Sequence, residues 1–591
     1  MSTRTPPFWP HLCLCAGIAT AASATQADVS QPPAAAPFDV IITHGHIIDG
    51  TGSPWYSADI GIRNGRIAAI GALADAKATQ HIDAGGRVVA PGFIDMLGQS
   101  ELTVLVDPSV PSKIFQGITT EITGEGESIA PLSSATRTAM QAALEHFHLN
   151  ADWTNFDGYF RRLEQQGIGI NLGSYVGATT VRETVLGMED RAPSSSELDR
   201  MRGLVREAME QGAVGVSTSL AYAPAPYAKT EEIIALAKEA AHNGGIYATH
   251  MRSEGDSLMS ALDETFRIAK EAEISVEIWH LKVAGKANWG QMPAVIAKIN
   301  EARAAGIDVA ADTYAYTAWF NDMSAFTPPW AHDGGKARLI ERLKDPKTRA
   351  RIKQDMTTPS HAWDTEWLEI TGPDAILIGV TQNPALHDLQ GQTIEQIAQA
   401  RGTPPIDTLL DILIEDGAFT QCAVFGMAQD DVTLALTQPW VSIDNDSAGT
   451  SPTGLLGEEH PHPRAYGTFP RILRKYVREE HALTLEDAIR KFSALPASRL
   501  KLADRGVIKQ GLWADLVIFD PDTITDRASF EDPNQLSVGM QWVLVNGVPV
   551  IAEGVASGAR PGKVLRGPGY HPPAAHEDNG TIDSTSKPGS K

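Results

Sequence analysis

The chain has 591 residues, of which 42% are hydrophobic, and this length and composition suit one large globular domain with smaller additions. Its 72 acidic residues outnumber 49 basic residues and give a formal charge of −23, which disfavours nucleic acid and anionic membrane surfaces as partners. Small molecules are therefore the expected ligands, and the oligomeric state is left open. Cys422 has no internal disulfide partner in the mature chain, and its apolar neighbours predict a buried thiol.

Residues 1–24 have the layout of a secretory signal peptide. Arg4 precedes an apolar run from Phe8 to Ala19, and Ala22-Ser23-Ala24 offers a small-residue cleavage site. The run is too short and too weakly apolar to remain as a membrane span. We therefore expect export, to a bacterial periplasm.

Short strand-like segments at both ends of the chain predict two small β pieces. Between residues 38 and 90, apolar runs are separated by turns such as Asn64-Gly65, a pair typical of tight hairpins. Residues 506–567 have the same character, for example in Ala514–Phe519 and Val543–Val550. We expect the two pieces to pack together as one composite β-sandwich.

Residues 91–505 alternate between strands and helices. A helix that Thr230 is expected to cap leads to a strand ending at His250, and a helix over 257–272 leads to a strand ending at His280. The same unit then repeats. Repeated αβ units of this length imply a parallel sheet, and their number suits a closed (β/α)₈ barrel of the TIM type, so the fold class is α/β.

Two stretches depart from this alternation. Residues 317–438 are far more than the single helix that a barrel needs at this point, so we expect an inserted subdomain there, before the last barrel strand. Residues 570–591 are rich in Pro, Ser, Thr and Gly and are expected to form a disordered tail.

Polar residues at the carboxyl ends of barrel strands converge on one mouth. His250 and His280 end successive strands, and Asp446 ends the last one. A hydrogen-bonded structural role explains one such histidine more easily than two, and imidazole with carboxylate suits zinc, with a position left for water. The third ligand is expected from two acids that each follow a glycine, Glu125 or Glu127, of which Glu125 is favoured because it lies closer to its strand.

Other catalytic motifs are misplaced or missing in the sequence. His44-Gly45-His46 has the His-x-His spacing of a metal-binding pair, but it lies in a strand before the barrel begins, so we assign no metal to it. No Gly-x-Ser-x-Gly nucleophile elbow occurs, and no phosphate-binding glycine loop with Lys and Ser or Thr occurs either. Metal-assisted hydrolysis is the chemistry that remains.

Five motifs are long enough to be specific: Pro91–Asp95, Tyr247–Gly255, His280–Gly290, His462–Arg471 and Arg560–Gly567. They closely resemble those of the D-aminoacylases, or N-acyl-D-amino-acid deacylases, of the amidohydrolase superfamily, and the likeness runs from about Phe38 to Gly567. The resemblance implies that His250 and His280 bind zinc and that Asp446 transfers protons. It further implies that the substrate carboxylate is held by Lys282 and Arg464, with Tyr314 or Tyr316 nearby.

The chain departs from the family pattern at the metal positions. The family's His-x-His corresponds to Leu97-Gly98-Gln99, and its bridging cysteine falls in Gly124–Glu127, which has no cysteine. Its histidine after the third strand corresponds to Ala178, and Ala213–Ser219 lacks the lysine that bridges two metals in some relatives. Two metals are therefore not expected.

Together these observations predict an exported amidohydrolase with a single divalent metal, zinc, held by His250, His280 and Glu125. Asp446 would deprotonate the bound water and then protonate the leaving amine of an N-acyl amino acid, with the D enantiomer suggested by the resemblance. One alternative is a hydrolase of a cyclic amide, dipeptide or lactone, since the missing positions reshape the pocket. The other is a metal-free binding protein built on the same barrel, although such a protein needs neither mouth histidine nor Asp446.

Overall fold

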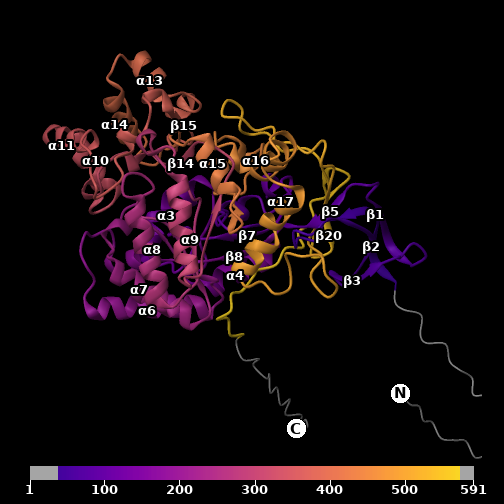
Figure 1. Cartoon of the computed structure of the whole chain (residues 1–591). Coiled ribbons are helices and arrows are strands. Elements are labelled where there is room, and N and C mark those ends of the chain that lie inside the picture. Colours follow the sequence, from indigo (N-terminus) through magenta and orange to yellow (C-terminus); the bar gives the residue numbers. More distant parts are fainter. Residues whose placement is uncertain (1–36, 573–591) are drawn as a thin grey trace, which may run out of the picture. The chain divides into compact units, whose positions relative to one another are not determined.

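The computed structural model describes residues 37–572 (Figure 1), and eight parallel strands form a closed barrel within them. Their pairing runs β6-β7-β8 and β9-β10-β11-β12-β13-β17, and β8 and β9 are successive parts of one strand. A parallel bridge between Gly98 and Ser447 joins the ends of β6 and β17 and closes the ring. The bounds are β6 (Phe93–Asp95), β7 (Ile118–Thr123), β8 (Asn171–Ser174), β9 (Val176–Gly177), β10 (Gly215–Ser219), β11 (Ile246–His250), β12 (Val276–Ile278), β13 (Val309–Thr313) and β17 (Val441–Ile443).

The barrel strands are buried along their whole length because helices cover them on the outside. Thr230 begins the helix that leads to His250 but does not cap it, since its hydroxyl donates to Glu264 at 2.8 Å instead. The bounds are α1 (Thr103–Val106), α2 (Pro111–Ile114), α3 (Ser134–His146), α4 (Phe156–Gln166), α5 (Ala178–Leu186), α6 (Ser195–Glu210), α7 (Thr230–His242), α8 (Leu258–Ala272), α9 (Met292–Ala304), α15 (Gln429–Leu436), α16 (Arg464–Arg471), the π-helix η8 (Ile472–Glu479), α17 (Leu485–Phe492) and α18 (Ala494–Arg499).

A fully buried lysine ties the first two barrel strands to the residues after the last. Lys113 on α2 donates to Asp95 Oδ2 at 2.8 Å, to Asn445 Oδ1 at 2.8 Å and to the backbone carbonyl of Ser447 at 2.7 Å. Glu121 Oε1 lies 3.5 Å from the same ammonium. Burial lowers the pKa of Lys113, but the two carboxylates outweigh this effect and raise it, so the lysine is charged.

Strands from both ends of the chain form one hydrogen-bonded sheet of nine strands, in the order β21-β20-β19-β18-β5-β1-β2-β3, with β4 beside β1. The antiparallel pairing of β5 with β18 joins the N-terminal and C-terminal pieces, which the sequence predicts to pack together. The bounds are β1 (Phe38–Ile47), β2 (Tyr56–Arg63), β3 (Arg66–Gly71), β4 (Ala78–Asp83), β5 (Val88–Pro91), β18 (Leu516–Phe519), β19 (Met540–Val545), β20 (Val548–Ala552) and β21 (Val555–Ala556).

An insertion with its own antiparallel sheet, β14-β16-β15, follows β13. Helix α15 packs against α9, β13 and β17, so it is a barrel helix and the insertion ends near Val424 rather than at residue 438. Cys422 is buried in β16, as predicted. The bounds are β14 (Trp319–Asp322), β15 (Ile376–Ile378), β16 (Gln421–Val424), α10 (Lys336–Lys344), α11 (Pro346–Met356), α12 (Glu366–Glu369), α13 (Ile394–Arg401) and α14 (Pro405–Glu415).

The chain stays anchored to the barrel slightly beyond the predicted start of the tail at residue 570. The Tyr570 and His571 amides donate to the carbonyls of Gly567 and Glu210, each at 3.1 Å, and the Arg566 guanidinium covers the Tyr570 ring at 4.4 Å. The rest of that predicted tail and the predicted signal peptide, residues 1–24, lie outside the described residues. Within residues 37–572, no helix combines the length and hydrophobicity that crossing a membrane requires.

Candidate active site

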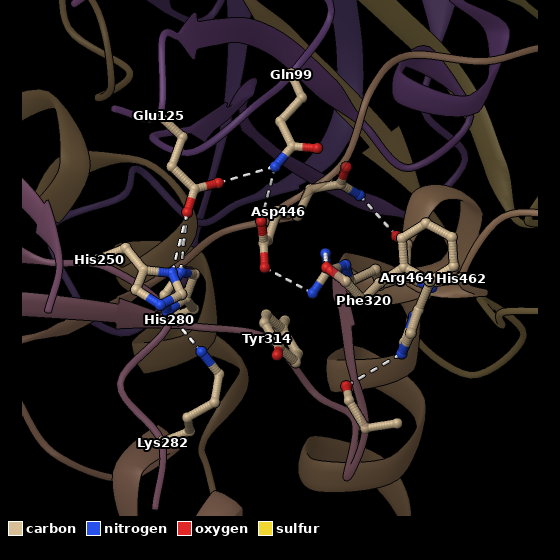
Figure 2. A network of polar contacts seen from close by, with 12 residues as sticks. Gln99, Glu125, His250, His280, Lys282, Tyr314, Phe320, Asp446, His462 and Arg464 are labelled. Carbon is tan, nitrogen blue, oxygen red and sulfur yellow. Dashed lines mark hydrogen bonds and ion pairs between the residues drawn. The ribbon is translucent and has the colours of Figure 1, made fainter. Parts of the chain in front are cut away.

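Three predicted ligands meet at the barrel mouth (Figure 2). Glu125 Oε1 lies 3.3 Å from both His250 Nδ1 and His280 Nε2. One potential ligand atom from each residue lies within 4.8 Å of the other two, and this is the one group of at least three His, Cys, Asp or Glu residues with such spacing in the described part of the chain. Two imidazoles and one carboxylate are a donor set that zinc hydrolases use, so these residues fit a zinc ion.

Two glycines give Glu125 its place. Gly124 and Gly126 have φ values of 98° and 66°, where other residues are strained. A Cβ on Gly126 would lie 2.5 Å from the Cβ of Ser219 and 2.6 Å from its backbone nitrogen, so only glycine fits against β10. The turn directs Glu125 towards the histidines. Glu127 interacts instead with the charges of Asp322 and Lys336 and lies outside the group of residues that could hold a metal ion.

Backbone strain coincides with two of the predicted site residues. His280 has a φ of 37° and Asp446 a φ of 45°, both in the left-handed region that residues other than glycine rarely adopt. Such conformations cost of order 1–3 kcal/mol and occur preferentially at functional sites. His280 lies two residues after the end of β12 and Asp446 three residues after the end of β17, so the strained backbone lies at the barrel mouth.

Glu254 supports the histidines from behind and is a residue that the sequence interpretation did not single out. It lies 3.0 Å from His280 Nδ1 and accepts hydrogen bonds from Lys282 Nζ at 2.8 and 2.9 Å. Burial and the Lys282 ammonium lower the pKa of His280, but Glu254 and Glu125 outweigh them and raise it to about 10. The surroundings of His280 therefore favour positive charge. The sequence offered one indication of this role: Glu254 lies four residues after His250, within the motif Tyr247–Gly255 that resembles the D-aminoacylases.

Asp446 follows the last barrel strand and faces the group formed by Glu125, His250 and His280. Its Oδ2 lies 2.6 Å from Arg464 Nη1, and its Oδ1 accepts a hydrogen bond from Gln99 Nε2 at 3.1 Å. Burial raises the pKa of Asp446; Arg464 opposes this rise and Glu125 adds to it, so the pKa stays above its ordinary value. A buried carboxylate with a raised pKa suits acid–base work.

Arg464, Lys282 and Tyr314 lie together, whereas Tyr316 lies elsewhere. The Tyr314 ring faces the Arg464 guanidinium at 4.7 Å and the Lys282 ammonium at 5.9 Å. Tyr316 donates to the carbonyl of Pro463 at 3.3 Å and packs under Arg471. Arg464 Nε has no hydrogen-bond partner among the residues described, although it is buried. The structure thus leaves a donor of Arg464 available for an anionic group.

The two positions that depart from the family's His-x-His have different surroundings. Leu97 is buried in an apolar cluster with Ile94, Met96 and Trp279. Gln99 is exposed, and its amide faces Glu125 and Asp446. Neither residue brings an imidazole to the mouth, and Ala178 is buried at the start of α5.

The chain is similar to known hydrolases over most of its length. The profile of the Amidohydrolase family matches residues 80–551. A D-aminoacylase of Alcaligenes xylosoxydans xylosoxydans is 36% identical over 530 residues, which cover 90% of this chain and 98% of that protein.

Two solved structures extend this similarity to the fold. An N-acyl-D-glutamate deacylase from Bordetella bronchiseptica, complexed with zinc and a phosphonate mimic of the tetrahedral intermediate, has a TM-score of 0.75 at 34% identity, covering 90% of this chain and 100% of that one. A D-aminoacylase structure concerned with a binuclear metal centre, with one-metal activation and second-metal attenuation, has a TM-score of 0.74 at 34% identity and the same coverage. These similarities confirm the predicted α/β barrel with an additional β domain.

Proposed function

Because this chain belongs to the amidohydrolase family, we propose that it is a deacylase that hydrolyses the amide bond of N-acyl amino acids, with the D enantiomers as its substrates. The observation that carries this proposal is the meeting of Glu125, His250 and His280 beside Asp446. The named activities of the relatives support the choice of an N-acyl-D-amino acid over a cyclic amide or a lactone.

We propose further that one divalent cation, zinc, serves this site and that Glu125, His250 and His280 hold it. The side chains at positions 97 and 99 support one cation rather than two, since Leu97 offers no ligand atom and the Gln99 amide donates hydrogen bonds to carboxylates. Zinc bound there supplies Lewis acidity, which polarises the substrate carbonyl and lowers the pKa of water.

Asp446 supplies the proton transfers of the reaction. Its Oδ1 takes a proton from the water that attacks the carbonyl carbon, and the same carboxyl then gives that proton to the amide nitrogen as the carbon–nitrogen bond breaks. The products are the carboxylate of the acyl group and the free amino acid. Arg464 holds the Asp446 carboxylate in position through the contact at 2.6 Å.

The substrate carboxylate would bind between Arg464 and Lys282, over the Tyr314 ring. Arg464 has an unpartnered Nε among the described residues, and a guanidinium recognises carboxylates with two parallel hydrogen bonds. Lys282 is already paired with Glu254, so we assign the main contact to Arg464 and an electrostatic contribution to Lys282.

Metal analysis combined with a substrate panel tests the proposed function. We expect purified protein to hold about one equivalent of zinc, to hydrolyse N-acyl-D-amino acids faster than their L enantiomers, and to lose activity on chelation and regain it with zinc. The panel includes cyclic amides, dipeptides and lactones. Turnover of one of these alone would redirect the proposal to that substrate class, and metal-free protein that binds N-acyl amino acids without turnover would overturn it.

Replacing Glu254 with glutamine is expected to weaken zinc binding roughly 10- to 100-fold, because Glu254 holds His280 Nδ1 and an amide is a weaker acceptor without charge. Zinc affinity is measured by competition with a chelating dye. The matched control is Glu239→Gln, since Glu239 is also buried and paired with arginines, Arg202 and Arg206, but lies on the outer helix α7. Equal zinc affinity in the two variants would contradict the role of Glu254.

A further inference from the structure

The Gln99 amide bridges the two carboxylates that face each other across the site. Its Nε2 donates to Glu125 Oε2 at 2.9 Å and to Asp446 Oδ1 at 3.1 Å (Figure 2). An ionised carboxylate can accept hydrogen bonds but cannot donate them. The NH₂ end of the amide, and not its oxygen, must therefore face the two partners. One neutral group therefore provides a hydrogen bond to a predicted metal ligand and another to the predicted acid–base residue.

The backbone fixes this bridge at the seam where the barrel closes. The backbone nitrogen of Gln99 donates to the backbone carbonyl of Ser447 at 3.2 Å, next to the parallel bridge between Gly98 and Ser447. Gln99 therefore approaches Asp446 from the neighbouring strand end, and its side chain reaches Glu125 at the end of β7. The contact does not depend on a mobile surface loop.

Two carboxylates this close to a shared group repel each other unless a positive or hydrogen-bond-donating group lies between them. Glu125 Oε1 is directed at the histidines, so its Oε2 is the oxygen that needs a separate partner. Asp446 has Arg464 on Oδ2, and its Oδ1 likewise needs one. Gln99 Nε2 has two protons, which match these two oxygens.

We propose that Gln99 is a positioning residue that takes the place of a second cation, holding Glu125 and Asp446 at a fixed separation with its two N–H groups. The inference rests on the proposed function, since it presupposes a metal held by Glu125, His250 and His280. Gln99 keeps one carboxylate oriented for the metal and the other oriented for proton transfer, and a second cation becomes unnecessary.

Two substitutions separate this role from a structural one. Gln99→Met has similar length without donors, and Gln99→Glu has the same shape but sets a third carboxylate against the other two. The control is Gln141→Met, because Gln141 also donates to a carboxylate, Glu145 at 2.6 Å, but lies exposed on α3. Each protein is titrated with zinc and its bound metal counted by mass spectrometry, and kcat and KM are measured with the best substrate of the panel.

The expected results differ between the variants. Gln99→Met binds zinc roughly 10- to 100-fold more weakly and has a lower kcat at saturating zinc, with little change in KM, because the substrate carboxylate contacts remain. Gln99→Glu binds a second zinc equivalent in excess metal, whereas the wild-type protein and Gln141→Met stay at one. Thermal unfolding of the metal-free proteins checks that each variant is folded at the assay temperature.

The outcomes distinguish the two proposals. If the wild-type protein binds no zinc, the proposed metal centre fails whatever the variants do. If the wild-type protein binds one equivalent and both Gln99 variants keep its zinc affinity, stoichiometry and kcat, the bridging role is overturned while the proposed function stands. A wild-type protein that takes up two equivalents also overturns the bridging role.

Discussion

Replacing Asp446 with asparagine is expected to lower kcat/KM by roughly 10²- to 10⁴-fold, the usual contribution of a general acid–base residue. The amide cannot take the proton of the attacking water or deliver it to the leaving nitrogen. Because Asp446 lies outside the group formed by Glu125, His250 and His280, the variant should retain its zinc. Steady-state kinetics with an N-acyl-D-amino acid and metal counting on the same sample provide the measurement.

The control for this variant is Asp431→Asn. Asp431 is another buried aspartate, but it accepts hydrogen bonds from the backbone of Gly290 and Met292 near the start of α9. It should leave kcat/KM close to the wild-type value. Full hydrolysis by Asp446→Asn with normal zinc content would rule out Asp446 as the proton-transferring residue.

Lys113→Met is expected to lower the free energy of unfolding by about 3–5 kcal/mol, because it removes the cation that, within residues 37–572, pairs with two buried carboxylates and leaves their charge uncompensated. Asp95 and Glu121 are fully buried, and burial raises the pKa of each, so their charge depends on the lysine. Chemical denaturation with the metal-free protein measures the loss.

A second buried lysine offers the comparison. Lys491 donates to the carbonyls of Gln438 and Val441 and forms no ion pair with a carboxylate among the described residues. Lys491→Met should therefore lower the free energy of unfolding clearly less than Lys113→Met. Adding Asp95→Asn and Glu121→Gln to Lys113→Met should recover part of the lost stability, since the two further substitutions remove the buried carboxylate charges that Lys113→Met leaves unpaired. Equal losses for the two lysine variants would show that burial alone, and not charge pairing, sets the effect.

The sequence predicted that Glu125, His250 and His280 meet because strand periodicity places the two histidines. His250 ends β11 and His280 follows β12 by two residues, and parallel strands in a barrel end at one mouth, so their meeting follows from local pattern and topology. Glu125 follows from the glycines beside it, whose conformations the structure shows to be obligatory. The strand order and the placement of Asp446 were predictable for the same reason.

Contacts between distant segments were not predictable in the same way. The Lys113 cluster joins residues 95, 113, 121 and 445 through side-chain geometry, and no local pattern marks it. The sequence places Gln99 where the family has a histidine, but it does not show that the side-chain nitrogen faces the site, since the positions of both carboxylates decide which end of the amide turns inward. Thr230 was predicted to cap a helix, but its hydroxyl donates to Glu264 on the next helix. The local sequence does not reveal this contact.

The closing seam of the barrel sets the order in which the site becomes complete as the ribosome makes the chain. The three proposed metal ligands have all been synthesised by residue 280, but Asp446 and the bridge at Ser447 come some 350 residues after β6. The nine-stranded sheet is completed later still, because β18 must be synthesised before it can pair with β5. A nascent chain can therefore contain the proposed metal ligands long before the active site is complete. Hydrolytic activity begins only when β18 has paired with β5.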